Sequence, residues 1–353
     1  MRILYGVVGE GMGHATRSRV VIDHLLRRGH EVKIVVSGRA YQLMKRHFSD
    51  VVEIQGLTIR YSKGAVNRNL SLLRNVLLSP SMLFQNAAAY LDDVRHFAPK
   101  LVISDFDSYA YFFAKRFDLP IVSIDNQQII HKCKHEKDIT QGVMADYRAT
   151  RAFVKAKLPG CDRYVITSFF MPHIRAKFED KVTIVPPILR EEILRATPTS
   201  GDHVLVYQTS TSDLELLTQL NRLSKRKFIV YGLRREAVQG NCTLRQFSEE
   251  GFVRDLASAR AVVTNGGLSL MQEAIYLGKP VFSVPVLHQF EQEMNARYCE
   301  RYGYGLSAPR VDADVLDAFL AQESKYVRAL KRHQQKGNEV LYRTVERALS
   351  ALT

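Results

Sequence analysis

The sequence predicts an α/β protein of two domains, each built around a parallel β-sheet. Its 353 residues are enough for two domains of ordinary size, and 46% of them are hydrophobic, as in folded proteins. In both halves, short β-branched runs alternate with amphipathic helices, which is the pattern of parallel strands joined by helices. A proline- and threonine-containing stretch, Val182–Ser200, separates the halves and is predicted to be a linker.

The first half begins with an apolar run, Arg2–Val8, that is predicted to be a strand. A helix is expected at Ala15–Arg28, because its apolar residues recur four positions apart and Gly29 provides a stop signal. The other predicted elements of this half are the strands Glu31–Val36, Leu101–Ser104 and Ile121–Ile124 and the helix Ser108–Phe117.

The second half repeats this order. Its predicted elements are the strands His203–Tyr207, Phe228–Val230, Ala261–Val263 and Val281–Val284 and the helices Thr211–Leu223 and Leu268–Leu277. The stretch Lys336–Leu352 is predicted to be a final helix. We therefore expect an N-terminal domain over residues 1–190, a C-terminal domain over residues 191–335, and a C-terminal helix, 336–353, that packs back on the N-terminal domain.

The composition limits the classes of function. A formal charge of +14 favours anionic partners, such as phosphorylated substrates or acidic membranes. No nucleic-acid partner is expected, because the sequence lacks a known docking motif and a basic tract with interleaved aromatic residues. The four cysteines are far apart, which predicts neither a disulfide framework nor a zinc site. With no secretory signal and no apolar run of roughly 20 residues, a cytoplasmic protein is expected.

A glycine-rich turn, Gly9-Glu10-Gly11-Met12-Gly13-His14, follows the first predicted strand and precedes the first helix. Backbone N–H groups and the positive end of the helix meet at such a turn and favour an anion. A dinucleotide fingerprint is the alternative interpretation. It would require glycine where His14 stands and an acidic residue after the second strand, where the sequence has Val36-Ser37-Gly38. The turn is therefore expected to suit an anion, but not as part of a redox dinucleotide-binding domain.

His14 is the candidate base. It lies where ligands bind in parallel sheets, and its ordinary pKa allows it to accept a proton from a hydroxyl, although a purely structural role in the turn is the alternative. Asp105 ends a buried strand, and the carboxyl ends of parallel strands converge on one crevice. Asp105 is therefore predicted to orient the His14 ring and to stabilise its protonated form. Asp107 is better suited to cap the following helix.

The most specific pattern lies in the second half. The turn Gly266-Gly267 precedes a helix and lets a ligand approach backbone amides at the helix N-terminus. Ser269 and Glu273 share one face of that helix, and Glu273 is expected to be free to accept hydrogen bonds from vicinal hydroxyls. Glu291 and Gln292 open another helix at the same rim and carry groups suited to sugar hydroxyls.

These motifs resemble the donor site of GT-B glycosyltransferases. Val262–Ala274, Gly278-Lys279-Pro280 and Pro285–Ala296 are similar in order and spacing to family 1, the UDP-sugar glycosyltransferases, and to family 28, the MurG-like N-acetylglucosaminyltransferases. The Gly9–His14 turn resembles the MurG-like glycine loop, and the resemblance covers essentially the whole chain. It implies two Rossmann-like domains whose parallel sheets face a central cleft.

The resemblance also implies roles for individual residues. His14 would be the base and Asp105 the acid that supports it. The residues expected to contact a nucleotide-sugar donor are Gly11, Gly13, Thr209, Ser210, Val253, Asn265, Gly266, Gly267, Leu268, Ser269, Glu273, Glu291 and Gln292. In this set the Gly-Gly turn would face the diphosphate, Glu273 the ribose, Glu291 and Gln292 the sugar, and the backbone near Val253 the base. Asn265 stands where family 1 members usually carry histidine.

The expected function is therefore glycosyl transfer. A hexosyl or N-acetylhexosaminyl group would move from a nucleotide sugar, with UDP the favoured nucleotide, to an acceptor hydroxyl with inversion and without a metal ion. No cofactor is expected, because the nucleotide sugar is a substrate. Two alternatives stay open: a nucleotide-sugar 2-epimerase and a non-catalytic nucleotide-sugar-binding protein of the same fold.

The segment Leu57–Leu91 has two interpretations. It contains no acidic residue and combines several leucines with the basic residues Arg60, Lys63, Arg68 and Arg74. An ordinary pair of helices is one interpretation. The other is a peripheral patch that holds the protein on the anionic inner face of a membrane, near a lipid-linked or cell-envelope glycan acceptor.

Overall fold

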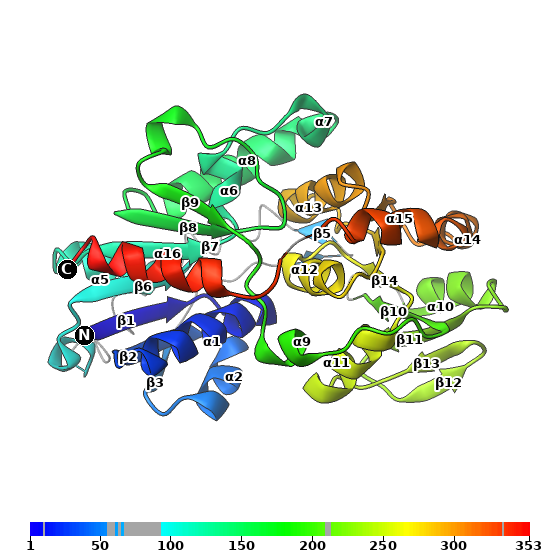
Figure 1. Ribbon diagram of the computed structural model, residues 1–353, viewed down its shortest axis with the longest axis horizontal. Helices are drawn as coiled ribbons and strands as arrows, with labels where there is room; N and C mark the ends of the chain where they lie inside the picture. Colours follow the sequence, from blue (N-terminus) through cyan, green and yellow to red (C-terminus); the bar gives the residue numbers. More distant parts are fainter. Residues whose placement is uncertain (10, 55–60, 63–64, 67–92, 209–212, 334) are drawn as a thin grey trace.

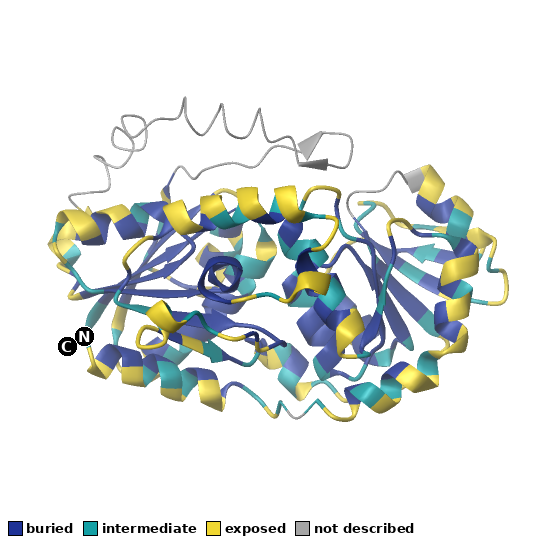
Figure 2. Ribbon diagram, turned by 90° about the horizontal axis from the view of Figure 1, so that it is seen from above, coloured by how far each residue is buried: buried dark blue, intermediate teal, exposed yellow. Residues whose placement is uncertain are grey.

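The computed structural model describes residues 1–9, 11–54, 61–62, 65–66, 93–208, 213–333 and 335–353. Two seven-stranded sheets form the centres of two layered domains that lie side by side (Figure 1). Buried strands lie inside each domain and helices with exposed outer faces surround them (Figure 2). Thr209, Ser210 and most of Leu57–Leu91 lie outside the described residues.

The N-terminal sheet has the strand order β3-β2-β1-β6-β7-β8-β9, and neighbouring strands are parallel. These strands are β1 (Arg2–Val7), β2 (Glu31–Ser37), β3 (Val51–Ile54), β6 (Leu101–Asp105), β7 (Ile121–Asp125), β8 (Arg163–Thr167) and β9 (Val182–Val185), with β4 (Tyr61–Ser62) and β5 (Ala65–Val66) as a separate antiparallel pair. The described helices are α1 (Met12–Arg27), α2 (Ala40–His47), α5 (Ser108–Arg116), α6 (Gln128–Lys132), α7 (Lys137–Thr140) and α8 (Met144–Lys157), with a 3₁₀ turn at Ala176–Phe178. The strand order reverses between β1 and β6, and ligands bind at the carboxyl ends of strands beside such a reversal.

The C-terminal sheet has the order β12-β13-β11-β10-β14-β15-β16, and all its neighbours are parallel except β12 and β13. Its strands are β10 (His203–Tyr207), β11 (Lys227–Tyr231), β12 (Ala237–Gln239), β13 (Cys242–Leu244), β14 (Ala261–Thr264), β15 (Val281–Ser283) and β16 (Gly305–Ser307). The helices are α9 (Glu191–Arg195), α10 (Asp213–Asn221), α11 (Glu249–Ser258), α12 (Leu268–Tyr276), α13 (Phe290–Arg301), α14 (Ala313–Ala321), α15 (Glu323–Leu330) and α16 (Glu339–Ser350). Here the order reverses between β10 and β14, which places the Gly-Gly turn after β14 at the reversal.

Local sequence signals account for these elements. Every residue of β6 and β7 is buried, as expected for parallel strands covered by helices on both faces. Asp107 caps α5, since its Oδ1 accepts a hydrogen bond of 2.8 Å from the backbone N–H of Ala110. The linker interpretation of Val182–Ser200 is wrong at its start, because Val182–Val185 forms β9 beside β8. A β-branched run of four residues satisfies its backbone better in a sheet than as a connection.

The final helix α16 returns to the N-terminal domain (Figure 1). Its buried residues share one hydrophobic cluster with β1 and β2. They are Leu341, Val345, Ala348 and Leu349. The chain therefore crosses between the domains twice, once before α9 and once before α16.

The two domains also share an apolar interface. Tyr298 of α13 stacks on Phe170 of the N-terminal domain with ring centroids 3.9 Å apart, and Phe290 lies 5.1 Å from Tyr147 of α8. Arg297 adds hydrogen bonds to the backbone carbonyls of Asp138, Ile139 and Gln141 at 3.0, 3.2 and 2.7 Å. Among the described residues, no helix has the length and apolar character needed to span a membrane.

Replacing Val345 with alanine should lower the free energy of unfolding by about 2 kcal/mol, because two buried methyl groups are lost and a cavity is left. Val340 provides a matched control on the same helix, since its side chain is 43% exposed and Val340→Ala should change stability by less than about 0.5 kcal/mol. Urea unfolding curves of both variants measure the difference. Equal effects would contradict the packing of α16 on the N-terminal sheet.

Candidate functional site

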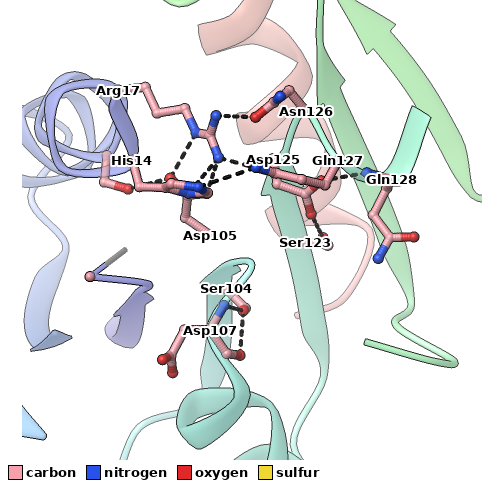
Figure 3. Close-up of polar contacts among 12 residues, drawn as sticks. His14, Arg17, Ser104, Asp105, Asp107, Ser123, Asp125, Asn126, Gln127 and Gln128 are labelled. Carbon is pink, nitrogen blue, oxygen red and sulfur yellow. Dashed lines mark hydrogen bonds and ion pairs between the residues drawn. The ribbon is translucent and has the colours of Figure 1, made fainter. Parts of the chain in front are cut away.

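The carboxyl ends of β1, β6 and β7 bring a polar cluster together at the cleft. His14 projects from the first turn of α1, Asp105 ends β6, and Asn126 and Gln127 follow β7 (Figure 3). His14 Nδ1 lies 2.8 Å from Asp105 Oδ1, so the two residues predicted as a pair are in contact. Gln127 Nε2 lies 3.2 Å from His14 Nε2. The Gln127 amide can only donate through this nitrogen, which assigns the His14 proton to Nδ1 and leaves Nε2 as the acceptor.

Arg17 is the member of this cluster that the sequence analysis missed. Its Nε donates to Asp105 Oδ2 at 2.8 Å and its Nη2 donates to Asp105 Oδ1, while Ser18 Oγ donates to Oδ2 at 2.8 Å. Arg17 and His14 are three positions apart and share a helix face, so spacing could have revealed it. Asp105 is fully buried, and although burial opposes ionisation, Arg17 and His14 hold its pKa at about 2.

The same arginine acts on the histidine. Arg17 Nη2 lies 2.6 Å from His14 Nδ1, so a positive charge on the imidazole ring would lie beside the guanidinium charge and is unfavourable. Burial and this cation lower the pKa of His14, and the attraction of Asp105 only partly offsets them. The ring is therefore neutral at pH 7, with its Nε2 lone pair available to accept a proton.

The loop after β7 is anchored by a buried carboxyl group. Asp125 accepts hydrogen bonds from Ser123 Oγ at 2.5 Å and from the backbone N–H of Gln128 at 2.8 Å. Burial raises its pKa to about 6. This anchor fixes the two intervening side chains, so that Gln127 faces His14 while Asn126 bridges Arg17 and Glu291 of the other domain.

The N-terminus of α12 faces this cluster across the cleft. Gly266 has a φ of +89°, and a Cβ there would lie 2.9 Å from the carbonyl oxygen of Gln292. A Cβ on Gly13 would lie 2.4 Å from Ser269 Oγ, so glycine permits the close approach of α1 to α12. Gly11 precedes α1 and Gly267 precedes α12, each at the N-cap position without a side-chain cap. Two helix N-termini with uncapped amides therefore meet here, an arrangement that favours an anion.

Two residues of the predicted donor motif make internal contacts. The side-chain amide of Asn265 is buried and donates to Gln208 Oε1 at 2.5 Å and to the carbonyl of Val284 at 3.2 Å. Leu268 is buried in the core and contributes its backbone rather than its side chain to the α12 N-terminus. Asn265 thus holds the ends of β10, β14 and β15 together at the base of the Gly-Gly turn.

Glu273 does not present the free carboxylate that the sequence analysis expected. Arg190 Nε donates to its Oε1 at 2.8 Å and Arg190 Nη2 donates to its Oε2 at 3.0 Å. Arg190 also donates to Glu249 of α11 at 2.9 Å. Arg190 lies in the stretch interpreted as a linker, and no pattern in the sequence connects it to α12. A ligand hydroxyl that donates to Glu273 must therefore use an oxygen that already accepts a hydrogen bond from Arg190.

The remaining predicted residues are Glu291, Gln292 and Val253. Glu291 accepts a hydrogen bond of 2.8 Å from Asn126 Nδ2, whereas Gln292 Oε1 accepts from the backbone N–H of Val286 at 2.9 Å and so fixes the loop before α13. Val253 lies inside α11, and its side chain lines a groove of about 670 Å³ together with Glu192 and Glu249.

In the described part of the chain, no group of three or more His, Cys, Asp or Glu side chains is placed to hold a metal ion.

Comparisons with known proteins place this geometry in context. Residues 1–323 match the family model described as "Glycosyl transferase family 1". An uncharacterized glycosyltransferase of Methanosarcina acetivorans is 24% identical over 326 residues, covering 86% of this chain and 85% of that protein. The fold is similar to CalG4, the calicheamicin glycosyltransferase, with a TM-score of 0.68, 15% identity, and coverage of 100% of this chain and 99% of that one.

A further similar structure is UGT2 of Phytolacca americana, solved in complex with UDP-2-fluoro-glucose and pterostilbene. Its TM-score is 0.67 at 14% identity, with 99% of each chain covered. These likenesses confirm the predicted fold class: two Rossmann-like domains in the GT-B arrangement, with one seven-stranded sheet in each.

Asp125 should make stability fall as the pH rises. Its folded pKa of about 6 lies above the ordinary value of 3.8, so its protonated form favours folding below pH 4 and this contribution is lost between about pH 4 and pH 7. Asp125→Asn keeps an acceptor for the Gln128 N–H and adds a donor for Ser123. It should therefore raise the free energy of unfolding at pH 8, by up to about 3 kcal/mol, and change it little at pH 4.

Chemical unfolding across this pH range measures the slope. Asp118→Asn, at an exposed carboxyl on the same domain, is the control and should leave the slope unchanged. A wild-type slope retained in the Asp125→Asn protein would show that Asp125 is not the titrating group.

Proposed function

Because the chain belongs to glycosyl transferase family 1, we propose that it transfers a sugar from a UDP-sugar to an acceptor hydroxyl, with inversion at the anomeric carbon. One observation carries this proposal: a neutral histidine held by a buried carboxylate faces the uncapped N-terminus of α12 and Glu291 across the cleft. The complex of the similarly folded Phytolacca protein with UDP-2-fluoro-glucose supports the choice of nucleotide.

In the proposed reaction, the diphosphate binds at the amides of Gly267, Leu268 and Ser269. These amides stabilise the negative charge that develops as the bond from the anomeric carbon to the diphosphate oxygen breaks. The acceptor hydroxyl approaches from the N-terminal domain and displaces Gln127 from His14 Nε2. His14 removes the hydroxyl proton as the new bond forms on the opposite face of the sugar, which inverts the configuration.

The nucleoside and the sugar would bind along the donor domain. Glu273 would accept a hydrogen bond from the ribose while it remains paired with Arg190, and Glu291 and Gln292 would face the sugar. The proposal includes no metal ion, because backbone amides supply the stabilisation of the leaving group.

We further propose a glycan or lipid-linked acceptor of the cell envelope, reached by peripheral attachment to an anionic membrane through the basic residues of 57–91.

A panel of nucleotide sugars tests this function. Purified protein should show a selective rise in melting temperature with UDP compounds. It should also release UDP from one donor only when an envelope lipid or glycan extract is added, with equal rates in the presence of EDTA. Turnover without any acceptor would instead indicate epimerase or hydrolase chemistry. If no nucleotide changes the melting temperature, the proposed nucleotide-sugar site is contradicted.

His14→Ala should lower kcat by roughly 10²- to 10⁴-fold, because the acceptor hydroxyl loses its base. The dissociation constant for UDP should change less than about threefold, since the diphosphate site lies in the other domain. Initial rates and calorimetric titration with UDP separate the two effects. Retention of full activity would exclude His14 as the base, whereas loss of UDP binding would show that the substitution disturbs the cleft as a whole.

A further inference from the structure

A continuous chain of hydrogen bonds joins the base cluster to the donor domain. Arg17, which holds Asp105 with Nε and Nη2, donates through Nη1 to Asn126 Oδ1. Asn126 Nδ2 then donates to Glu291 Oε1 at 2.8 Å (Figure 3 shows the contact of Arg17 with Asn126). Asn126 thus contacts both a group of the base cluster and a group of the donor domain.

The orientation of the Asn126 amide is fixed by its two partners. A guanidinium can only donate and a carboxylate can only accept, so the amide oxygen must face Arg17 and the amide nitrogen must face Glu291. Asn126 is only 3% exposed and Arg17 only 6%, so water cannot easily replace Arg17 at the amide oxygen. The anchor at Asp125 prevents the loop from shifting to relieve the contact.

Glu291 is held on one side only. Its Oε1 accepts from Asn126, and no other hydrogen bond or ion pair of Glu291 occurs among the described residues. Its Oε2 can therefore accept a hydrogen bond from a ligand in the cleft while Asn126 fixes the plane of the carboxylate. Domain contact itself does not depend on Asn126, because the stacked pair Phe170 and Tyr298 and the hydrogen bonds of Arg297 join the domains independently.

We propose that Asn126 is a positioning residue that sets the Glu291 carboxylate relative to His14 through Arg17. Given the glycosyl transfer proposed above, on which this inference rests, Asn126 aligns the donor sugar and the acceptor base through a single side chain. Small errors in the relative position of two reacting groups are costly, so the loss of this link should reduce kcat more than it raises the KM for the donor.

An isosteric exchange of charge tests the contact. Asn126→Asp keeps the acceptor for Arg17 but places a carboxylate against Glu291, which is unfavourable. Glu291→Gln keeps a single acceptor oxygen, so while that oxygen accepts from Asn126 the glutamine NH₂ faces the sugar and can only donate. In the double variant, the introduced carboxylate accepts from both Arg17 and the introduced glutamine amide. The hydrogen bond therefore returns with its polarity reversed, and the glutamine oxygen remains available to the sugar.

The four proteins form a double-mutant cycle. Asn126→Asp should lower kcat roughly tenfold or more in the wild-type background and less than about threefold in the Glu291→Gln background. Melting temperatures without ligand should show the same dependence, because the contact exists before any donor binds. Arg297→Gln is the control, because Arg297 joins the two domains but takes no part in the hydrogen bonds from Arg17 to Glu291. Its effect on kcat should be equal in the wild-type and Glu291→Gln backgrounds.

The outcomes separate the possible failures. An equal effect of Asn126→Asp on melting temperature in both backgrounds would overturn the contact. Coupling in melting temperature without coupling in kcat would make Asn126 a structural residue only and would overturn the positioning role. If the wild-type protein turns over no nucleotide sugar, the proposed function fails, and the melting temperatures still decide whether Asn126 and Glu291 interact. If Asn126→Asp does not fold alone, recovery of folding and kcat in the double variant supports the proposal, and its absence contradicts it.

Discussion

The buried carboxylate of Asp105 is the constraint on which the N-terminal half of the site depends. A carboxylate without solvent contact costs several kcal/mol unless opposite charge and hydrogen bonds surround it. Arg17, Ser18 and His14 supply both, and all three come from the first turns of α1. Satisfying this one group therefore fixes the rotation of α1 on the sheet. The position of His14 follows from that rotation, because it lies one helical turn before Arg17.

The same requirement reaches the other domain. A buried guanidinium must use its N–H groups, and Arg17 Nη1, the nitrogen that does not contact Asp105, donates to Asn126. Asn126 in turn has a nitrogen to satisfy, and Glu291 of α13 accepts from it. The apolar contacts of α13 with the N-terminal domain bring Glu291 within reach. The hydrogen bonds from Arg17 through Asn126 to Glu291 and the apolar contacts of α13 thus support each other. The apolar contacts hold Glu291 close enough to accept from Asn126, and that hydrogen bond satisfies the buried amide of Asn126.

The sequence allowed the fold to be predicted well, because long elements carry a strong pattern. Each predicted strand is present. The rule that the carboxyl ends of parallel strands converge also allowed the contact between His14 and Asp105 to be predicted. Applying that argument to the end of the next strand would have found Asn126 and Gln127 as well. Short strands of the two main sheets were missed: β3, β9, β12, β13 and β16 have three or four residues each and β8 has five, too few for a clear period to show. A run of four β-branched or apolar residues becomes a strand only if a neighbour offers it hydrogen bonds.

The partners of the predicted site residues were harder to predict than the residues themselves. Glu273 was expected to be free because it lies on a helix face away from the packing stripe. Arg190, which occupies both its oxygens, is 83 positions away in sequence and comes from a connection between the domains. Only the three-dimensional arrangement of two domains brings these groups together. Charge pairs of this kind leave no periodic signal, whereas the capping of α5 by Asp107 is local and was predicted correctly.

Arg17 also changes what the histidine can do. In an isolated histidine–carboxylate pair, the carboxylate stabilises the imidazolium and raises the pKa of the base. Here burial and Arg17 outweigh Asp105 and lower the pKa of His14, so the base is unprotonated at neutral pH but weak. A weak base can take the proton of an acceptor hydroxyl only when that oxygen has already begun to bond to an electron-poor carbon.

Any imidazole is far too weak a base to deprotonate an alcohol before bonding begins, so in the proposed reaction departure of the diphosphate would run ahead of proton transfer. The anomeric carbon gains positive character first, and the hydroxyl that bonds to it becomes acidic enough for His14. Most of the stabilisation then has to act on the leaving group, where the uncapped amides of α12 meet the developing charge. In this proposal the N-terminal domain would position the acceptor and supply a late proton acceptor, and the C-terminal domain would stabilise the leaving group.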